Sequence, residues 1–375
     1  MKTMHLLVAG LVLGLMACDG ETSEDGGKST SLTVKTLAQG LDHPWAMAFL
    51  PAGDILVTER SGALKRLSAE VKTLAEIGGV PNVDARGQGG LLDVALDPDF
   101  ADNRYVYLTW SGAGEGGNAT HLGRGRLEDN RLRDFETLFV ATPFVDSSKH
   151  FGSRLSFDGD YLFMTVGDRG QRDRAQDLDD HNGSVLRLHH DGSVPDDNPF
   201  VGRDDARDAI YSYGHRNPQG AARHPETGQL WIHEHGPRGG DEINIPEAGA
   251  NFGWPQATYG REYHGPEIAP DEHGQGLVGP IHQWTPSIAP SGMAFYTAER
   301  FPEWQGDLFV GALALTHLAH LELEGTRVVN EQEHLNDRGR RIRAVRQGPD
   351  GYLYLLTDQD NGRLVRVSPL EDGES

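Results

Sequence analysis

Side chains that can bind an anion or a metal ion are concentrated between residues 211 and 254. This stretch contains Gly214-His-Arg-Asn-Pro-Gln-Gly220 and His233-Glu-His-Gly-Pro-Arg-Gly-Gly-Asp-Glu-Ile-Asn244, and it ends at Trp254. The polar residues stand among glycines and prolines, which is typical of loops rather than of a core. The apolar residues 230–232 predict a short strand that holds these loops in place. A bound anion, a metal ion or both would explain this composition better than a solvated loop.

A histidine and an aspartate could form a second reactive group. His150 precedes one predicted strand, and Asp168 follows the end of the next one, at residues 161–166. A carboxylate at a strand end that faces a histidine of the same unit can orient that histidine as a general base. However, the chain has 17 histidines, and a single histidine is more often a surface or core residue.

Three further residues could contact a ligand. Gln88 lies within the glycine-rich residues 87–90, where the backbone can approach a ligand closely. A glycine-rich turn that binds no ligand would show the same sequence. Arg341 and Arg343 are two residues apart, so on a strand both point to one side. Such a pair suits a carboxylate or a phosphate, although a solvent-facing basic stripe has the same spacing.

Short apolar strands must position these groups, since apolar residues rarely recur at helical spacing over a dozen residues. Six such segments recur along the chain, at residues 54–58, 104–109, 160–165, 229–233, 307–311 and 352–357. Five of them come shortly after a glycine, namely Gly53, Gly159, Gly228, Gly306 and Gly351. Several are followed by a second strand-like segment, which predicts repeated antiparallel hairpins.

The repeat predicts an all-β fold, a six-bladed β-propeller of four-stranded antiparallel sheets. Each unit cannot bury both faces of its small sheet alone, so neighbouring units must stack. A β-sandwich or a β-solenoid is the alternative, but a sandwich rarely needs such long glycine-rich inserts between strands. In a propeller these inserts gather on one face around the central channel, where ligands bind.

Composition limits the kind of partner. The 375 residues carry a net charge of −22, so we expect no nucleic-acid binding, because the chain would approach a polyanion against its own field.

The N-terminus predicts processing rather than fold. Residues 1–17 have a basic start and a short apolar run, as in a signal peptide. The segment ending at Cys18 resembles a bacterial lipobox, which implies lipid on Cys18, a tether over residues 18–31 and a propeller over residues 32–370. We expect the domain on the periplasmic side, anchored to the inner or the outer membrane. An ordinary secretory signal with a chance cysteine is the alternative.

Six motifs occur in an order that resembles the soluble PQQ-dependent aldose sugar dehydrogenases, relatives of soluble quinoprotein glucose dehydrogenase and of sorbosone dehydrogenase. PQQ is pyrroloquinoline quinone. The resemblance runs from about residue 41 to about residue 367. The motifs are Gly87-Gln-Gly-Gly-Leu-Leu-Asp93, His150-Phe-Gly-Ser-Arg154, Gly214-His-Arg-Asn-Pro-Gln-Gly220, Glu234-His-Gly-Pro-Arg-Gly-Gly-Asp-Glu-Ile-Asn244, Pro286-Ser-Ile-Ala-Pro-Ser-Gly292 and Arg341-Ile-Arg343.

The resemblance implies an enzyme with PQQ and Ca²⁺ near the axis of a six-bladed propeller. It would oxidise the C1 hydroxyl of an aldose to a lactone and pass electrons to an external acceptor. His150 matches the general base, which takes the hydroxyl proton while hydride passes to the quinone, and Asp168 matches the carboxylate that orients it. Arg216 and Asn217 match residues over the quinone, with Arg216 stabilising negative charge.

Further matches concern the cofactor and the metal. Gln88, Arg341, Arg343 and Ser287 match contacts to PQQ. Trp284, which precedes prolines that stiffen a loop, is expected from the sequence alone to roof the pocket on the substrate side. The carbonyl groups of Gly236 and Pro237 match calcium ligands, since calcium prefers oxygen. Glu242, with the carbonyl of Phe252, matches a second, structural calcium site.

One position departs from the family. Ala314 stands where a lysine is often found, which removes a cation that His317 or another residue would have to replace. Two alternatives to the dehydrogenase therefore stay open: a lipid-anchored binding propeller that has lost PQQ, and a calcium-dependent hydrolase. The hydrolase would give no reason for Arg216, Arg341 and Arg343 to converge.

Overall fold

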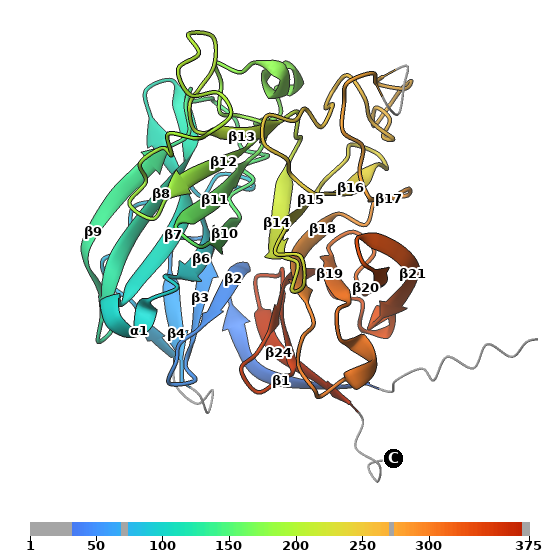
Figure 1. Cartoon of the computed structure of the whole chain (residues 1–375). Coiled ribbons are helices and arrows are strands. Elements are labelled where there is room, and N and C mark those ends of the chain that lie inside the picture. The colour runs from blue at the N-terminus through green and yellow to red at the C-terminus, as the bar shows by residue number, and fades with distance from the viewer. Residues whose placement is uncertain (1–31, 69–73, 270–273, 370–375) are drawn as a thin grey trace, which may run out of the picture. The chain divides into compact units, whose positions relative to one another are not determined.

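The computed structural model describes residues 32–68, 74–269 and 274–369, which form six antiparallel sheets of four strands each. Each sheet is called a blade and is numbered along the chain (Figure 1). The predicted signal peptide and tether, residues 1–17 and 18–31, lie outside the described residues. In the described ranges no helix is long and apolar enough to cross a membrane.

Blades 1 to 3 use consecutive strands in simple order, with the first strand innermost. Blade 1 comprises β2 (Pro44–Phe49), β3 (Ile55–Glu59), β4 (Leu64–Leu67) and β5 (Leu74–Glu76). Blade 2 comprises β6 (Leu91–Leu96), β7 (Tyr105–Gly114), β8 (Gly117–Glu128) and β9 (Arg131–Val140), with the short helix α1 (Phe100–Asn103) between β6 and β7. Blade 3 comprises β10 (Leu155–Asp158), β11 (Tyr161–Val166), β12 (Ser184–His189) and β13 (Ile210–Tyr213).

Blades 4 and 5 repeat this order, and blade 6 combines the two ends of the described chain. Blade 4 comprises β14 (Pro218–Arg223), β15 (Leu230–Glu234), β16 (Asp241–Asn244) and β17 (His282–Trp284); blade 5 comprises β18 (Pro290–Phe295), β19 (Leu308–Ala312), β20 (Leu318–Glu324) and β21 (Arg327–His334). Blade 6 comprises β22 (Ile342–Gln347), β23 (Leu353–Thr357), β24 (Gly362–Pro369) and β1 (Leu32–Leu41). Three 3₁₀ helices lie in connections, at Arg172–Gln176, Pro302–Trp304 and Asn336–Arg338.

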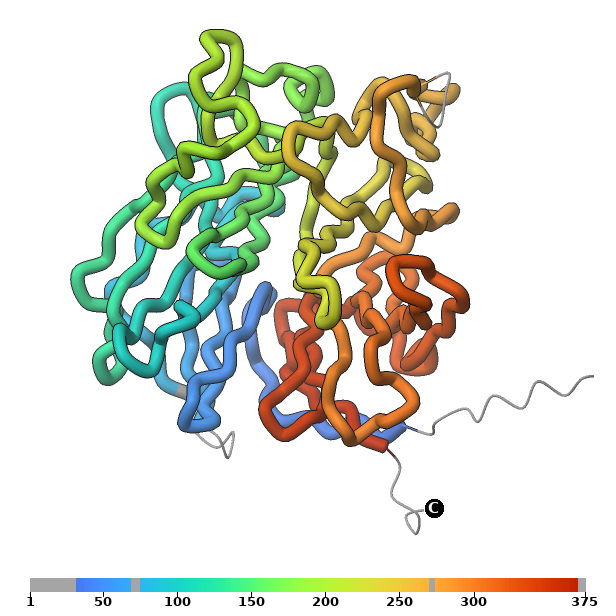
Figure 2. Tube along the Cα trace, viewed as in Figure 1, coloured from blue at the N-terminus to red at the C-terminus, as the bar shows by residue number. Residues whose placement is uncertain are grey.

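The innermost strands form a closed ring. Each of β2, β6, β10, β14, β18 and β22 contacts the innermost strand of the next blade, and β22 contacts β2. β1 pairs antiparallel with β24, so blade 6 is completed by the first strand of the described residues (Figure 2). The predicted six-bladed propeller is therefore confirmed.

The core lies between the blades rather than within any one of them. Six buried hydrophobic clusters are present in the described residues, and each combines two neighbouring blades. The second strands β3, β15, β19 and β23 are buried at every position. Both faces of these strands meet a neighbouring sheet, which explains why the sequence shows continuous apolar segments instead of alternation.

The glycines before the apolar segments have a conformational reason. Gly53, Gly159, Gly228, Gly306 and Gly351 have φ angles between 56° and 91°. These angles lie in the left-handed region, which glycine adopts without a steric penalty. Each of these glycines turns the chain from the first strand of a blade into the second.

The predicted site residues share one place in the repeat. Gln88, His150, Arg216, Ser287 and Arg341 each lie one to five residues before the first strand of a blade. The ring brings the starts of these innermost strands together, so residues far apart in the sequence reach one region.

Candidate active site

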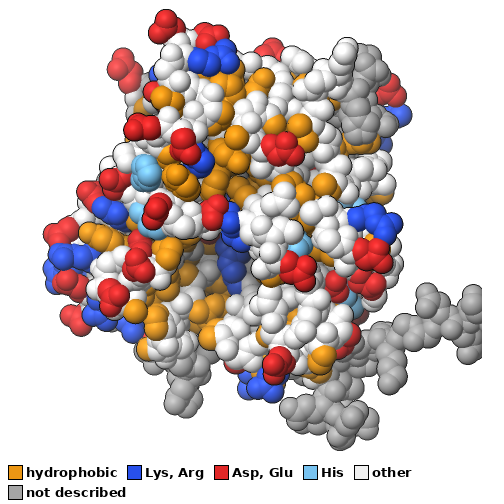
Figure 3. Space-filling model, viewed as in Figure 1, with side chains coloured by type: hydrophobic (Ala, Val, Ile, Leu, Met, Phe, Trp, Pro, Cys, Tyr) orange, Lys and Arg blue, Asp and Glu red, His pale blue; other side chains and the backbone are white. Residues whose placement is uncertain are grey.

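A cavity of about 990 Å³ lies where the innermost strands begin. Four of its lining residues lie one to three residues before an innermost strand, namely His43, Gln88, Ala289 and Arg341. The space-filling view shows a hollow with basic side chains inside it (Figure 3). The other lining residues are Trp45, Arg60, Gln219, His235, Leu313, Arg340, Arg343, Asp358, Gln359, Asp360, Asn361 and Arg363.

The cavity is strongly positive although the whole chain is negative. Five guanidinium groups and two carboxylates line it, which leaves three positive charges when the histidines are neutral. Nε atoms of Arg60, Arg343 and Arg363 are buried and have no hydrogen-bond partner among the described residues. The excess positive charge of the lining suits a ligand with several negative charges.

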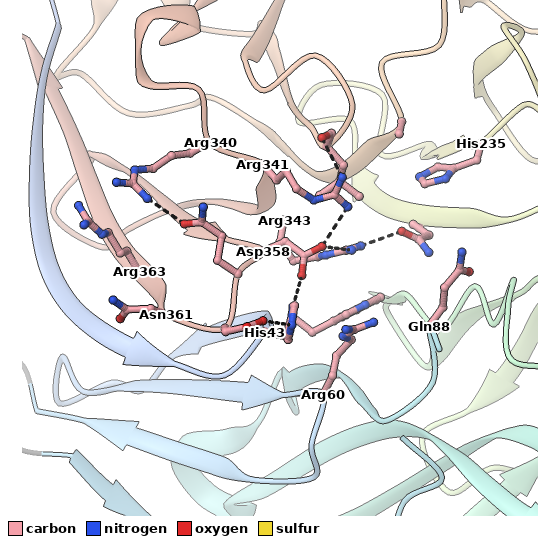
Figure 4. Close-up of a pocket in the computed structure, with 16 residues that line it drawn as sticks. His43, Arg60, Gln88, His235, Arg340, Arg341, Arg343, Asp358, Asn361 and Arg363 are labelled. Atoms are coloured by element: carbon pink, nitrogen blue, oxygen red, sulfur yellow. Dashed lines mark hydrogen bonds and ion pairs between the residues drawn. The ribbon is translucent and has the colours of Figure 1, made fainter. Parts of the chain in front are cut away.

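Asp358 organises the arginine pair (Figure 4). Its Oδ2 accepts from Nη2 of Arg343 at 2.8 Å and from Nη2 of Arg341 at 3.2 Å, and its Oδ1 lies 3.0 Å from Nδ1 of His43. Burial alone would raise the pKa of Asp358, but Arg343, His43 and Arg341 outweigh burial and hold it far below its usual value. Nη1 of Arg343 also donates to Oε1 of Gln219 at 2.9 Å. Both predicted arginines therefore face the cavity in fixed positions.

His150 and Asp168 form the predicted pair, but neither is among the residues that line the cavity. Nδ1 of His150 lies 2.6 Å from Oδ1 of Asp168, and the two residues are 8% and 1% exposed. The backbone N–H of His150 donates to Oε1 of Gln88 at 2.8 Å, so Gln88 connects the pair to the cavity. A Cβ at Gly167 would lie 2.3 Å from the carbonyl oxygen of His150, so only glycine allows this approach.

The two pKa shifts of this pair suit a general base. Burial lowers the pKa of His150, and nearby Arg216 adds to this, while the hydrogen bond that Asp168 accepts acts in the opposite direction. Burial would raise the pKa of Asp168, but His150 and Arg216 outweigh it and lower the pKa. Near neutral pH the imidazole is therefore neutral and the carboxylate is ionised, which is the form that can accept a proton.

Arg216 and Asn217 lie close to the segment that contains His150. Nη1 of Arg216 donates to the carbonyl oxygens of His235 at 2.9 Å and of Gly236 at 2.8 Å. Oδ1 of Asn217 accepts from the N–H of Gly152 at 3.2 Å, and Nδ2 of Asn217 has no partner in the described part of the chain. Arg216 reaches the large cavity only through His235, which lines it.

The loop that contains the predicted calcium carbonyls is held by Asp241. Its Oδ1 accepts from the N–H of Gly236 at 2.8 Å and from Oγ of Ser287, and its Oδ2 accepts from the N–H of Ala289 at 2.8 Å. Ser287, predicted to contact the cofactor, therefore binds Asp241 in this structure. The carbonyl of Gly236 bonds Arg216 but keeps a second lone pair for a cation.

Glu242 lines a smaller hollow together with Glu234, Phe252 and Trp254. Burial and the negative charge of Glu234 raise the pKa of Glu242 to about 8. Nδ2 of Asn244 donates to both glutamates, at 3.1 and 3.2 Å. No group of three or more His, Cys, Asp or Glu side chains in the described ranges is arranged to hold a metal ion, so a cation here would need carbonyl oxygens as well.

Trp284 does not roof the cavity. It lies in β17, the outermost strand of blade 4, and packs in the core between blades 4 and 5. Its Nε1 donates to Oε1 of Glu331 at 2.8 Å. The prediction that Trp284 faces the substrate is therefore wrong, because the side chain of this residue fills an interface between blades.

Ala314 lies beside the cavity residue Leu313, and its N–H donates to the carbonyl of Ile288 at 2.9 Å. His317 is 1% exposed and is absent from the cavity lining. His317 is therefore poorly placed to replace the missing cation, whereas Arg60 faces the cavity.

Sequence reasoning missed Asp358, His43 and Trp254. Asp358 comes immediately after β23, the second strand of blade 6, and Asp168 comes two residues after β11, the second strand of blade 3. An acidic residue just after a second strand could therefore have identified Asp358 as a site residue. His43 and Trp254 stand in connections, and no pattern in the sequence distinguishes them.

Comparisons with known proteins agree with this geometry. Residues 41–366 match the family model described as glucose/sorbosone dehydrogenase. The chain is 49% identical to the aldose sugar dehydrogenase YliI of Escherichia coli over 347 residues, which cover 90% of this chain and 93% of that protein.

Two solved structures are similar over nearly the whole described chain. The apo form of the soluble aldose sugar dehydrogenase of Escherichia coli has a TM-score of 0.88 and 49% identity, and the match covers 91% of this chain and all of that one. The PQQ-bound form of the aldose sugar dehydrogenase of Streptomyces coelicolor has a TM-score of 0.74 and 30% identity, covering 90% and 99%. The six-bladed ring, the family match and these relatives lead to one conclusion: the chain belongs to the glucose/sorbosone dehydrogenase family.

Proposed function

We propose that this protein is an aldose sugar dehydrogenase that uses PQQ and Ca²⁺. It oxidises the C1 hydroxyl of an aldose to the lactone and passes the electrons to an external acceptor. One observation carries the proposal: a buried histidine–aspartate pair is hydrogen-bonded to Gln88, which lines a cavity with three excess positive charges. A binding propeller would have no need for the pair, and a neutral sugar alone would have no need for the charges.

The cavity fits PQQ chemically. PQQ has three carboxyl groups, which match the three excess positive charges of the cavity. Arg343 and Arg341 have guanidinium groups that bind carboxylates well, and Arg60 lines the same cavity. When bound, PQQ supplies the quinone that accepts hydride from C1 of the sugar.

His150 acts as the general base. Its Nδ1 donates to Asp168, so Nε2 is the nitrogen that is free to take the proton of the C1 hydroxyl. Asp168 fixes the tautomer and stabilises the imidazolium that forms. Arg216 is fixed by two carbonyl oxygens and stabilises negative charge that develops close to it.

Calcium is assigned to two places. The carbonyls of Gly236 and Pro237 would hold one ion, where a divalent cation acts as a Lewis acid. Glu242, with Glu234 and the carbonyl of Phe252, would hold a second ion that stabilises the fold. The raised pKa of Glu242 supports this second site, because a nearby cation would relieve the repulsion between the two glutamates.

The location is a separate proposal. We infer that Cys18 carries lipid and that the domain faces the periplasm. In cells, the wild-type protein is expected in the membrane fraction, and Cys18→Ala in the soluble fraction, because a single residue provides the anchor. An unchanged distribution of Cys18→Ala, measured by fractionation and immunoblotting, would argue for an ordinary secretory signal.

The central test is reconstitution. The purified domain, incubated with PQQ and Ca²⁺, is expected to reduce a redox dye when aldoses are added, and to bind PQQ saturably by absorbance. Absence of dye reduction across a broad sugar panel, with PQQ still bound, would argue against oxidation of those sugars and also against a propeller that has lost PQQ. Absence of both would overturn the proposal.

His150→Ala is expected to lower kcat by roughly 10²–10⁴-fold, because a general base contributes about that much. Its affinity for PQQ, measured by titration, is expected to stay unchanged. His189→Ala is the control, since His189 packs on Tyr161 away from the cavity. Wild-type turnover in His150→Ala would mean that another group is the base.

Arg343→Ala is expected to weaken PQQ binding by roughly 10–100-fold, the usual effect of losing a hydrogen bond to a charged group. Turnover at saturating PQQ should change less. Arg366→Ala serves as the control, because Arg366 stacks on Tyr352 and lies outside the cavity lining. Equal PQQ affinity in Arg343→Ala and Arg366→Ala would remove Arg343 from the cofactor site.

Glu242→Gln tests the second calcium site through stability. The pKa of Glu242 is about 8 in the folded chain and 4.5 as its ordinary value. Between these values the folded chain holds the extra proton, so without calcium its stability falls as pH rises towards 8.

The thermal midpoint of the calcium-free wild type should therefore fall from pH 5 to pH 8, and calcium should restore it by several degrees, on the order expected for a tightly bound ligand. Glu242→Gln should lose both effects, whereas the exposed control Glu324→Gln should keep them. Equal stabilisation of Glu242→Gln by calcium would exclude this site.

A further inference from the structure

We propose that Trp254 is a positioning residue for the proposed general base, and that its indole N–H fixes Asp168, which in turn orients His150. The proposal rests on the proposed function for the role of His150. The contact itself is independent of any cofactor. Nε1 of Trp254 donates to Oδ2 of Asp168 at 2.8 Å, across 86 positions in the sequence.

The two oxygens of Asp168 have different partners. Oδ1 accepts from His150 at 2.6 Å and from the N–H of Gly170 at 2.6 Å. Oδ2 accepts from Trp254, and Asp168 is 1% exposed. With a donor on each oxygen, the carboxylate cannot rotate without breaking a charge-assisted hydrogen bond. Trp254 therefore fixes the orientation of the Asp168 carboxylate, to which His150 is hydrogen-bonded.

Trp254 is itself fixed by blade 3, although it belongs to the connection between β16 and β17 of blade 4. Its N–H donates to the carbonyl of Gly214 at 2.9 Å, and its carbonyl accepts from Nε2 of Gln176 at 2.7 Å. Gln176 is held in turn by Asn251, whose Nδ2 donates to Oε1 of Gln176 at 2.8 Å. A donor anchored in this way is preorganised, which is what a positioning residue requires.

The indole ring of Trp254 also lies near the guanidinium group of Arg216. Cζ of Arg216 lies 5.3 Å from the centroid of the Trp254 ring, a distance at which a guanidinium is attracted to the ring face. Phenylalanine keeps an aromatic face and most of the volume, and it removes the N–H donor together with the five-membered ring. Trp254→Phe therefore separates the hydrogen bond from the packing.

Loss of the N–H changes the base in a definite direction. Without this donor the charge of Asp168 is less neutralised, so the carboxylate attracts the protonated imidazole more strongly. The pKa of His150 should rise, by roughly half a unit to one unit. His150 would then be protonated over a wider pH range, and the less fixed carboxylate would orient it less well.

The chain offers a matched control. Trp284 is 6% exposed, Trp254 is 7% exposed, and each donates its indole N–H to a carboxylate oxygen at 2.8 Å. Trp284→Phe removes the same kind of hydrogen bond from a core that does not touch Asp168 or His150. A general loss of stability should affect both variants alike.

The experiment follows His150 by NMR in the protein without cofactor and measures kinetics after reconstitution. In Trp254→Phe, the Nδ1–H resonance of His150 should move, its pKa should rise, and the acid limb of the kcat/KM profile should shift to higher pH. The value of kcat should fall on the order of tenfold, by analogy with outer-shell partners of active groups, with PQQ affinity unchanged.

The outcomes separate the two proposals. Trp284→Phe should leave the NMR signals and the pH profile as in the wild type. If Trp254→Phe leaves the resonance and the pKa of His150 unchanged, the positioning role is wrong, whatever the activity. If the wild type shows no dehydrogenase activity but the NMR changes occur, the proposed function fails while the coupling of Trp254 to His150 stands.

Discussion

The pairing of β1 with β24 closes the ring, and the candidate active site depends on this closure. β1 comes from the start of the described chain, and it pairs with β24 from Leu32 opposite Pro369 to Leu41 opposite Gly362. His43 lies two residues after β1, and its N–H donates to the carbonyl of Gln359 at 3.0 Å. Closure therefore brings His43 to Asp358, which holds Arg341 and Arg343. The same backbone pairing that completes blade 6 also completes the charged wall of the cavity.

The ring also concentrates like charges at a cost. Arg343 is 6% exposed, and burial lowers its pKa, with Asp358 opposing the shift and Arg60 and Arg341 adding to it. Buried cations are tolerated only where partners offset the loss of water. Asp358 offsets part of this, since it binds two guanidinium groups, but the cavity keeps a positive excess. An anionic ligand would neutralise this excess. The arrangement of charges therefore favours ligand binding over the stability of the ligand-free chain.

Much of the fold could be predicted from the sequence because each repeat is marked by short local patterns of residues. The second strands are buried on both faces, which gives continuous apolar segments, and the turns before them need positive φ at glycines such as Gly53 and Gly306. The predicted residues Gln88 and His150 could be found because they precede innermost strands, where the ring collects side chains.

The remaining parts of the site depend on contacts between blades, which no local pattern records. Asp358 meets His43 only after closure, and Trp254 reaches Asp168 from a neighbouring blade. Trp284 was misjudged for the same reason. A tryptophan in a proline-rich connection suits a pocket roof, but blade 5 packs over it and makes it part of a core.

Arg216 contacts the proposed cation site and also affects the pKa of His150. A change at Arg216 would therefore alter both cation binding and the pKa of the base. Its guanidinium donates to the carbonyls of His235 and Gly236, and its N–H is held by Glu234. The same charge adds to the effect of burial in lowering the pKa of His150. A cation on the carbonyl of Gly236 would share that oxygen with Arg216 and would add positive charge near the imidazole. A metal ion bound there would therefore lower the pKa of His150 further, which would keep the imidazole neutral over a wider pH range but would make it a weaker base.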